Sequence, residues 1–252
     1  MNAPGRFAGW PADAASLVER SIERHGGRAA WHAFRSLRVE CRKFSGLALA
    51  VTGAGHTYAF PPVFLVDPKA QRTTFPDFPA PGRTTIYERG ALTVLDADSG
   101  RLDIFEHYRA RFTGMFAKLR RWSDLDAAYF LGYSQANYHA YPFALEDLVF
   151  IARREYAQTG DRWQELTLEY PAGLDTHCRR QRFHFDGTAL LRRVDYRVDI
   201  VGAASTSAHF YENCTVVSGV VFPRRRRIVA RLFDVPTPVR LIVLDVTLTA
   251  IG

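Results

Sequence analysis

The pattern of apolar and polar positions changes character twice along the chain. Between residues 13 and 22, apolar residues recur every three or four positions, which predicts an amphipathic helix that ends at Gly26 and Gly27. A second helical turn is expected at 29–34. From Leu37 onward apolar and polar residues alternate, which is typical of a strand with one buried face.

Most of the remaining chain consists of alternating segments separated by turn residues such as Arg89-Gly90 and Ser218-Gly219. Before the middle of the chain, strands are expected at 37–42, 47–51, 63–67, 71–75, 84–88, 91–96 and 102–105. After the middle, they are expected at 151–158, 163–170, 179–185, 190–200, 209–217, 220–230 and 239–249. Consecutive strands joined by such short turns pair antiparallel, which argues against a parallel sheet alternating with helices.

The middle of the chain lacks strand alternation. Its apolar residues recur at helical spacing from Leu125, with Ser123 or Asp124 as the cap, and Pro142 suits the first turn of a second helix. The sequence therefore predicts one mainly antiparallel α+β domain of 252 residues. Its expected parts are a loose arm at 1–11, N-terminal helices at 12–35, a first β half at 36–110, a helical cap at 123–150 and a second β half at 151–252.

The composition favours a hydrophobic small molecule as partner. Aromatic residues make up 13% of the chain, and aromatic side chains commonly line apolar pockets. The formal net charge of +7 arises from 33 basic and 26 acidic residues, a mild imbalance without a zinc-finger spacing or an RNA-recognition signature. Nucleic-acid binding is therefore not expected.

Other absences limit the function classes. The three cysteines are far apart, residues 1–11 contain no apolar core of a secretory signal, and no apolar run suits a membrane span. We therefore expect a cytoplasmic protein without stable membrane insertion. Phosphate-loop, dinucleotide, nucleophile-elbow and zinc-helix motifs are missing, so no cofactor and no metal are expected. The oligomeric state stays open.

A family resemblance runs through most of the chain. The residues that carry it are His25-Gly26-Gly27 with Trp31, 35–39, 128–133, Asn137-Tyr138, Pro142-Phe143, Thr176-His177, 183–185, 190–193, Asp195-Tyr196, 220–223, Arg225 and Arg226. In these positions the sequence resembles the LolA-like superfamily of lipoprotein carriers and lipid-binding proteins, and more closely an uncharacterised group of bacterial proteins with that expected fold. The resemblance implies a strongly curved antiparallel sheet, like a half-open barrel, capped by helices over an apolar cavity.

The densest group of polar aromatic residues lies in the predicted cap. Tyr129, Tyr133 and Asn137 are spaced by four residues and share one helix face, and Tyr138 and His139 follow. The face either looks into a cavity, where these residues would contact a ligand, or packs its rings on the sheet with the polar tips at the rim.

The candidate for acid–base chemistry is His177, because imidazole titrates near neutral pH. Asp175 or Asp195 is expected to orient it, unless the histidine bonds within its own turn. Alternate charged positions at 193–199 share one strand face, which is either solvated or places Asp195 in the cavity as a buried acid. Tyr196 lies on the opposite face and is a candidate ligand contact.

Further polar candidates come from later strands. His209 and Tyr211 share a strand face, and His184, if it points inward with Tyr211, completes a polar end of the cavity; otherwise it faces solvent. The arginine run 224–227 divides between two faces. It indicates either a charged edge strand or a clamp for a carboxylate or phosphate, in which Arg226 is the candidate ligand contact.

Two functions from different classes fit this pattern. The first is binding of a lipid-like molecule, isoprenoid or polyketide in the cavity. The second is a cofactor-independent isomerase, cyclase or dehydratase acting on such a substrate, in which His177, Tyr133 or Asp195 moves protons and Asn137 or Tyr138 holds an oxyanion. A third hypothesis is a peripheral protein that contacts an anionic membrane surface through 224–227 and the N-terminal helix.

Overall fold

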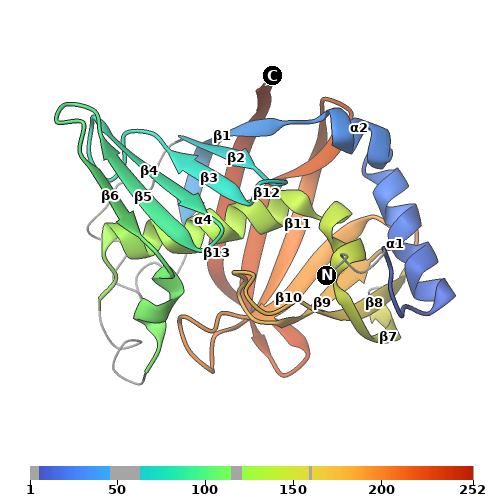
Figure 1. Ribbon diagram of the computed structural model, residues 1–252. Helices are drawn as coiled ribbons and strands as arrows, with labels where there is room; N and C mark the ends of the chain where they lie inside the picture. Colours follow the sequence, from blue (N-terminus) through green and yellow to red (C-terminus); the bar gives the residue numbers. More distant parts are fainter. Residues whose placement is uncertain (1–5, 46–62, 115–120, 159–160, 252) are drawn as a thin grey trace.

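One continuous antiparallel sheet dominates the architecture. The computed structural model describes residues 6–45, 63–114, 121–158 and 161–251. In these ranges the strands form a 13-stranded sheet in the order β6-β5-β4-β3-β2-β1-β13-β12-β11-β10-β9-β8-β7 (Figure 1). The sheet is strongly curved and does not close, which confirms the expected half-open antiparallel fold.

The strand order follows from short hairpins within each half of the chain. The first half contains β1 (Ser36–Ser45), β2 (Val63–Asp67), β3 (Arg72–Phe75), β4 (Arg83–Glu88), β5 (Ala91–Asp96) and β6 (Leu102–Phe105). The second half contains β7 (Val149–Gln158), β8 (Asp161–Glu169), β9 (Arg180–Phe185), β10 (Leu191–Arg197), β11 (Thr206–Val217), β12 (Val220–Leu232) and β13 (Val235–Ile251). The halves join where β1 pairs with β13.

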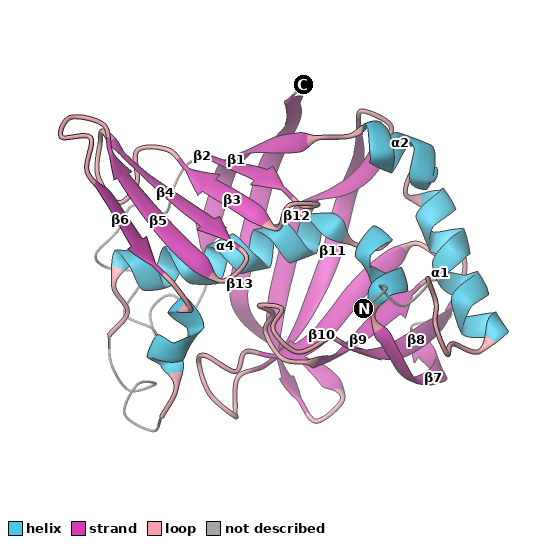
Figure 2. Ribbon diagram, viewed as in Figure 1, coloured by secondary structure: helices cyan, strands magenta, loops and turns pink. Residues whose placement is uncertain are grey.

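This topology places the helical insert inside the curve of the sheet. The chain leaves the sheet at one free edge, β6, and re-enters it at the other, β7. Helix α4 (Asp124–Ala140) makes much of this crossing, with 17 residues that span about 26 Å at the usual rise. Figures 1 and 2 show α4 lying across the concave face, and it packs on β2, β3 and β4.

Helix α4, the main part of the predicted cap, is buried along most of its length. Apart from Asp124, Leu125 and Phe130, all of its residues are buried. The helix therefore lies deeper than a helix that packs its rings on the sheet with the polar tips at the rim. A crossing segment that is surrounded by a curved sheet has neighbours on all sides, so its polar residues must find partners in the interior.

Two smaller helices close the end of the molecule near β7. Helix α1 (Ala12–Arg24) buries the apolar face expected from its sequence, and α2 (Gly27–Ala33) places Trp31 in a stack on Phe143, with ring centroids 4.4 Å apart. The described part of the N-terminal arm is docked rather than loose, because the Trp10 indole Nε1 donates to the Leu148 carbonyl at 2.9 Å.

The predicted elements correspond closely to the observed ones, with local exceptions. The second helix of the insert is the short 3₁₀ helix η4 (Phe143–Asp147), and a further 3₁₀ helix, η2 (Tyr108–Phe112), was not expected. The strand expected at 47–51 lies outside the described residues. None of the helices in the described ranges is long and apolar enough to cross a membrane.

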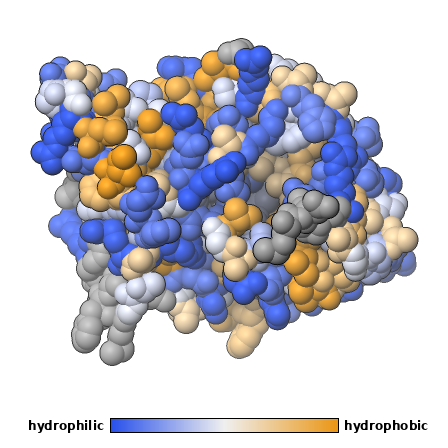
Figure 3. Space-filling view, in the orientation of Figure 1, coloured by the Kyte–Doolittle hydropathy of each residue, from blue (hydrophilic) through white to orange (hydrophobic). Residues whose placement is uncertain are grey.

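The free edge at β6 carries exposed apolar side chains. Figure 3 shows apolar surface gathered over β4–β6, at its upper left, where Leu95, Leu102 and Ile104 are exposed. Elsewhere the described apolar side chains concentrate between α4 and the concave face of the sheet. The candidate site lies within this buried layer.

Candidate functional site on the concave face

A chain of hydrogen-bonded phenols and imidazoles runs from α4 to β11. The Tyr133 hydroxyl lies 2.9 Å from His177 Nδ1, and the Tyr138 hydroxyl is hydrogen-bonded to His177 Nε2. The Tyr138 hydroxyl also lies 2.9 Å from the Tyr196 hydroxyl, which in turn is 3.3 Å from His209 Nδ1. The structure therefore brings together five of the residues selected from the sequence.

The backbone explains why these side chains meet. Tyr133 and Tyr138 project from consecutive turns of α4, while Tyr196 and His209 point inward from the neighbouring strands β10 and β11. His177 lies in the segment before β9, and its carbonyl accepts a hydrogen bond from the Asp199 amide at 3.0 Å. His177 thus bonds two phenols of α4 rather than its own turn.

Burial keeps this chain neutral. Burial lowers the pKa of His177 to about 3, and the positive charge of Arg109 acts in the same direction. Burial likewise raises the pKa of Tyr133 and of Tyr138 above the ordinary value of a phenol. At neutral pH the site holds an uncharged imidazole between two protonated phenols, an arrangement that can pass or accept a proton.

The second feature of the site is a buried guanidinium. Arg226 of β12 is 1% exposed, and its Nη1 donates to Gln135 Oε1 at 2.7 Å. Its Nη2 lies 2.9 Å from His139 Nε2. The other ring nitrogen of His139, Nδ1, lies 2.8 Å from the Gln135 carbonyl. A carbonyl only accepts, so Nδ1 carries the proton and Nε2 accepts from Arg226. The guanidinium also lies over the Tyr138 ring, 5.1 Å from its centroid.

Arg226 differs from most other described arginines in its charged neighbours. Within the described ranges no carboxylate lies within ion-pair distance of this guanidinium, although most other described arginines have such a partner. Burial accordingly lowers the pKa of Arg226 below the ordinary arginine value. An isolated buried cation is unfavourable unless an anion or a set of acceptors compensates it.

Three polar atoms beside this guanidinium have no hydrogen-bond partner among the described residues: His209 Nε2, the Tyr211 hydroxyl and Arg226 Nε. The His209 and Tyr211 rings are 4.6 Å apart, and Tyr211 is directly opposite Arg226 in the register of β11 and β12. Each unsatisfied buried polar atom costs about 1–3 kcal/mol, so three neighbouring ones indicate a place adapted to a polar group.

Two of the predicted helix residues have other roles. Tyr129 is buried in an aromatic stack, with its ring centroid 5.3 Å from that of Tyr108 and 5.6 Å from that of Phe112. Asn137 donates from Nδ2 to the Asp175 carbonyl at 2.9 Å. These contacts fix α4 against η2 and against the segment that carries His177.

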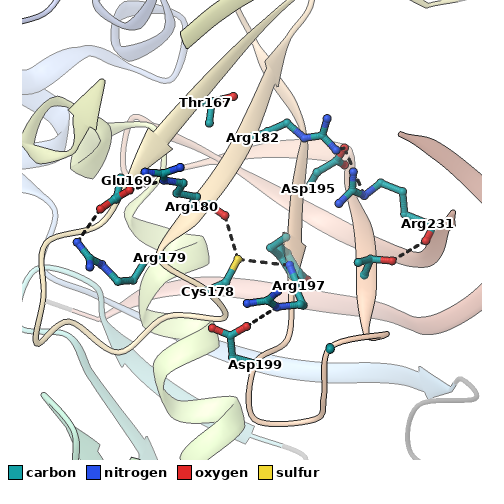
Figure 4. A pocket seen from close by; sticks show the side chains of 13 residues that line it. Thr167, Glu169, Cys178, Arg179, Arg180, Arg182, Asp195, Arg197, Asp199 and Arg231 are labelled. Carbon is teal, nitrogen blue, oxygen red and sulfur yellow. Dashed lines mark hydrogen bonds and ion pairs between the residues drawn. The ribbon is translucent and has the colours of Figure 1, made fainter. Parts of the chain in front are cut away.

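Asp195 and His184 lie on the convex face, across the sheet from His177. Both Asp195 oxygens accept hydrogen bonds from Arg193 at 2.6 Å, and His184 Nε2 is 3.3 Å from Asp195 (Figure 4 shows this face). Burial acts to raise the pKa of Asp195, but hydrogen bonds from Arg193 and His184 outweigh it and hold the pKa below its usual value.

The placement on the convex face corrects three expectations. Asp195 does not orient His177, His184 does not share a face with Tyr211, and the face of Arg193 and Asp195 is buried rather than solvated, at 0% and 2% exposure. The alternation of side chains along the strand was predicted correctly, but Arg193 and Asp195, which form an ion pair, face away from α4.

The arginine run divides between the two faces as predicted. Arg225 and Arg227 lie 3.4 and 2.7 Å from Glu212 on the convex face, and Arg226 points inward. The edge-strand interpretation is wrong, because β12 is paired on both sides by β11 and β13. Among these arginines, Arg226 faces the interior, which is the orientation needed to hold a carboxylate or phosphate there.

The sequence reasoning missed Gln135. Its side chain and its carbonyl hold Arg226 and His139 respectively. The spacing of four residues between Gln135 and His139 on one helix was a detectable signal, but their partner comes from a strand 87 residues beyond His139. Among the described residues no group of His, Cys, Asp or Glu has the arrangement of a metal site.

No family model matches the chain, and no curated protein matches it by sequence. Among solved structures, a LolA superfamily protein from Nitrosomonas europaea is similar at a TM-score of 0.48 and 12% identity, covering 93% of this chain and 92% of that one. A DUF1329 family protein from Desulfovibrio piger is similar at a TM-score of 0.45 and 13% identity, with the same coverage. Each is a similarity of fold.

Proposed function

We propose that the protein binds a hydrophobic small molecule with an anionic group, and that Arg226 recognises the anion on the concave face. The observation that carries this proposal is the buried guanidinium without a described carboxylate partner. A bound carboxylate or phosphate would supply the missing charge, and charge-assisted hydrogen bonds are the strong ones.

The unpaired atoms around Arg226 support an anion rather than a cation. Arg226 Nε and the Tyr211 hydroxyl are donors without a described acceptor. His209 Nε2 is a third donor in the tautomer whose Nδ1 accepts from Tyr196. A carboxylate or phosphate has the acceptor oxygens that these three donors lack.

The surroundings support an apolar body for the ligand. Aromatic side chains that are almost fully buried line the same side of the sheet, among them Tyr141, Phe183 and Phe222. An apolar ligand body gains about 25 cal/mol per Å² of its own apolar surface that such side chains remove from water. An acid with a lipid-like, isoprenoid or polyketide body combines both features.

A paired-ligand titration tests the proposal. A long-chain fatty acid and an isoprenoid acid are titrated into the protein by calorimetry beside the alcohols with the same carbon skeletons. We expect the wild type to prefer the acids, and Arg226→Met to weaken acid binding about tenfold or more while alcohol binding stays the same.

Arg227→Met is the matched control, because it removes an arginine from the same strand but from the opposite face. Replacement of an uncompensated buried charge by methionine should leave the free energy of unfolding equal or higher, which urea denaturation verifies. Equal binding of acid and alcohol to the wild type, or an unchanged acid preference in Arg226→Met, would refute the role of Arg226.

A second candidate function is proton transfer on a bound substrate, and the phenol–imidazole chain favours it. His177 bonds Tyr133 and Tyr138 through its two ring nitrogens, and the chain ends at His209 close to Arg226. A guanidinium there would stabilise an oxyanion while the neutral imidazole accepts a proton. An isomerase, cyclase or dehydratase needs no more than this.

The two functions separate in one experiment. The ligand that co-purifies with the wild type, identified by native mass spectrometry, is incubated with protein and followed by chromatography. If the protein is a catalyst, the wild type converts the ligand, and His177→Gln abolishes conversion while it still binds the ligand. Asp195→Asn is the control, because Asp195 lies on the other face of the sheet, and it should leave conversion unchanged. Lack of conversion by the wild type leaves binding as the function.

A further inference from the structure

The convex face carries a second, unrelated feature, an open cleft of about 740 Å³ over β8, β9 and β10. It is lined by charged side chains, by Cys178 and Tyr196, and by the small residues Thr167, Ala203 and Thr206, and Figure 4 shows it from close by. Its charged residues are Glu169, Arg179, Arg180, Arg182, Asp195, Arg197, Asp199 and Arg231. We call this feature the convex arginine cleft.

The cleft has more cations than anions. Five arginines face three carboxylates, which leaves an excess of two positive charges. Arg179 and Arg180 share the single carboxylate of Glu169, as Figure 4 shows, while Arg197 pairs with Asp199 at 2.6 Å. Each guanidinium presents five N–H donors. The donors of the cleft therefore outnumber the carboxylate oxygens that the described residues offer them.

The positive charge that is least compensated lies at Arg182 and Arg231. Figure 4 shows both approaching Asp195, but at 3.7 and 3.8 Å, because Arg193 already occupies both Asp195 oxygens. Their closer carboxylate is Asp234, at 2.7 Å from Arg182 and 3.3 Å from Arg231, while Arg182 also lies 4.0 Å from the buried Glu165. That side chain is 57% exposed, so the solvent weakens its compensation.

We propose that the convex arginine cleft binds a phosphate group between Arg182 and Arg231. Guanidinium groups match the geometry of phosphate oxygens, and a phosphate monoester or pyrophosphate neutralises the excess charge. The phosphate belongs either to a soluble phosphorylated molecule or to the headgroup of a phospholipid. Asp234 competes with it for the same two arginines and therefore sets the affinity.

Calorimetric titration with inorganic pyrophosphate at low ionic strength tests the cleft. We expect saturable binding that the double variant Arg182→Gln/Arg231→Gln weakens about tenfold or more. Asp234→Asn should tighten binding, because it removes the competing carboxylate, and a misfolded variant cannot produce that gain. Sedimentation with phosphatidic acid vesicles, but not with phosphatidylcholine vesicles, assigns the phosphate to a lipid if the same double variant abolishes it.

The control is Arg225→Gln, which removes an arginine from the same strand and face but from outside the cleft, where it lies 3.4 Å from Glu212. Arg226→Met should also leave pyrophosphate binding unchanged, which separates this cleft from the concave site. The proposal is overturned if neither pyrophosphate nor phosphatidic acid binds, if Arg225→Gln weakens binding as much as the double variant, or if Asp234→Asn weakens it.

Discussion

At the scale of single residues, Gly132 decides how closely α4 approaches the sheet. A Cβ atom on Gly132 would lie 2.3 Å from Cβ and 2.5 Å from Cγ of Tyr87, closer than real contacts allow. The Gly132 carbonyl also accepts a hydrogen bond from Thr73 Oγ1 at 2.9 Å. A glycine in mid-helix is unfavourable by about 1 kcal/mol, and here it permits a contact between helix and strand.

We expect Gly132→Ala to lower the free energy of unfolding by about 1–3 kcal/mol, because overpacking outweighs the better helix propensity of alanine. Urea denaturation measures the change. Gly187→Ala is the control, since its nearest atom is the flexible Asp161 carboxylate at 3.2 Å. A stabilised Gly132→Ala protein would show that α4 can move away from β4 at little cost.

At the scale of elements, the start of α4 is fixed by a capping box. Ser123 Oγ accepts from the Asp126 amide at 3.2 Å, and Asp126 Oδ2 accepts from the Ser123 amide at 2.7 Å. Asp126 is buried and also accepts from the Tyr108 hydroxyl at 3.2 Å. The capping box therefore satisfies the free amides at the start of α4, and it also connects α4 to η2 through Tyr108.

Ser123→Ala should lower the free energy of unfolding by about 1 kcal/mol, because it leaves an amide of the first turn without its acceptor. Ser123→Thr keeps the hydroxyl and should stay near the wild type. Thermal and urea unfolding distinguish the two. If alanine and threonine behave alike, the cap contributes nothing and burial of the helix alone determines its start.

At the scale of the whole molecule, burial of neutral imidazoles makes stability depend on pH. Burial lowers the pKa of His25 to about 4 and that of His177 to about 3, against 6.5 for the free side chain. Burial also lowers the pKa values of His139, His184 and His209. Below pH 6.5 the unfolded chain takes up protons that the folded protein does not.

Stability from these histidines is complete above pH 6.5 and is lost as the pH falls towards their folded pKa values. For His25 the loss extends to about pH 4, and for His177 to about pH 3. Each contributes about 1.4 kcal/mol per pH unit in its window. Urea denaturation at pH 7, 6 and 5 should show a falling free energy, with a smaller slope in His177→Gln; a constant value would contradict this account.

The strands could be predicted because their signals are local. Alternation and turn pairs such as Arg89-Gly90 and Ser218-Gly219 determine where a strand begins and ends, and the observed bounds agree within a few residues for most strands. Helix α4 was also predicted, but not its depth. The sequence left open whether its polar residues look into a cavity or lie at the rim of the sheet, whereas Gln135 and His139 are buried against Arg226.

The candidate site could be predicted only in part, for the same reason. The structure brings the candidates His177, Tyr133 and Tyr138 into one hydrogen-bonded group, whereas Asp195 is separated from them by the thickness of the sheet. Alternation states that Asp195 and Tyr196 face opposite ways. It does not state which of the two faces α4, because both faces of this strand are buried.

The sequence by itself determined the antiparallel strands, the helical insert, a cap of α4 at Ser123 or Asp124 and the division of the arginine run between two faces. These features depend on spacing and turn chemistry within short segments. Only the tertiary structure decided that the insert crosses the inside of the curve and that Arg226 meets no described carboxylate there. Those features depend on the pairing of β1 with β13, two strands at opposite ends of the chain, which no local pattern encodes.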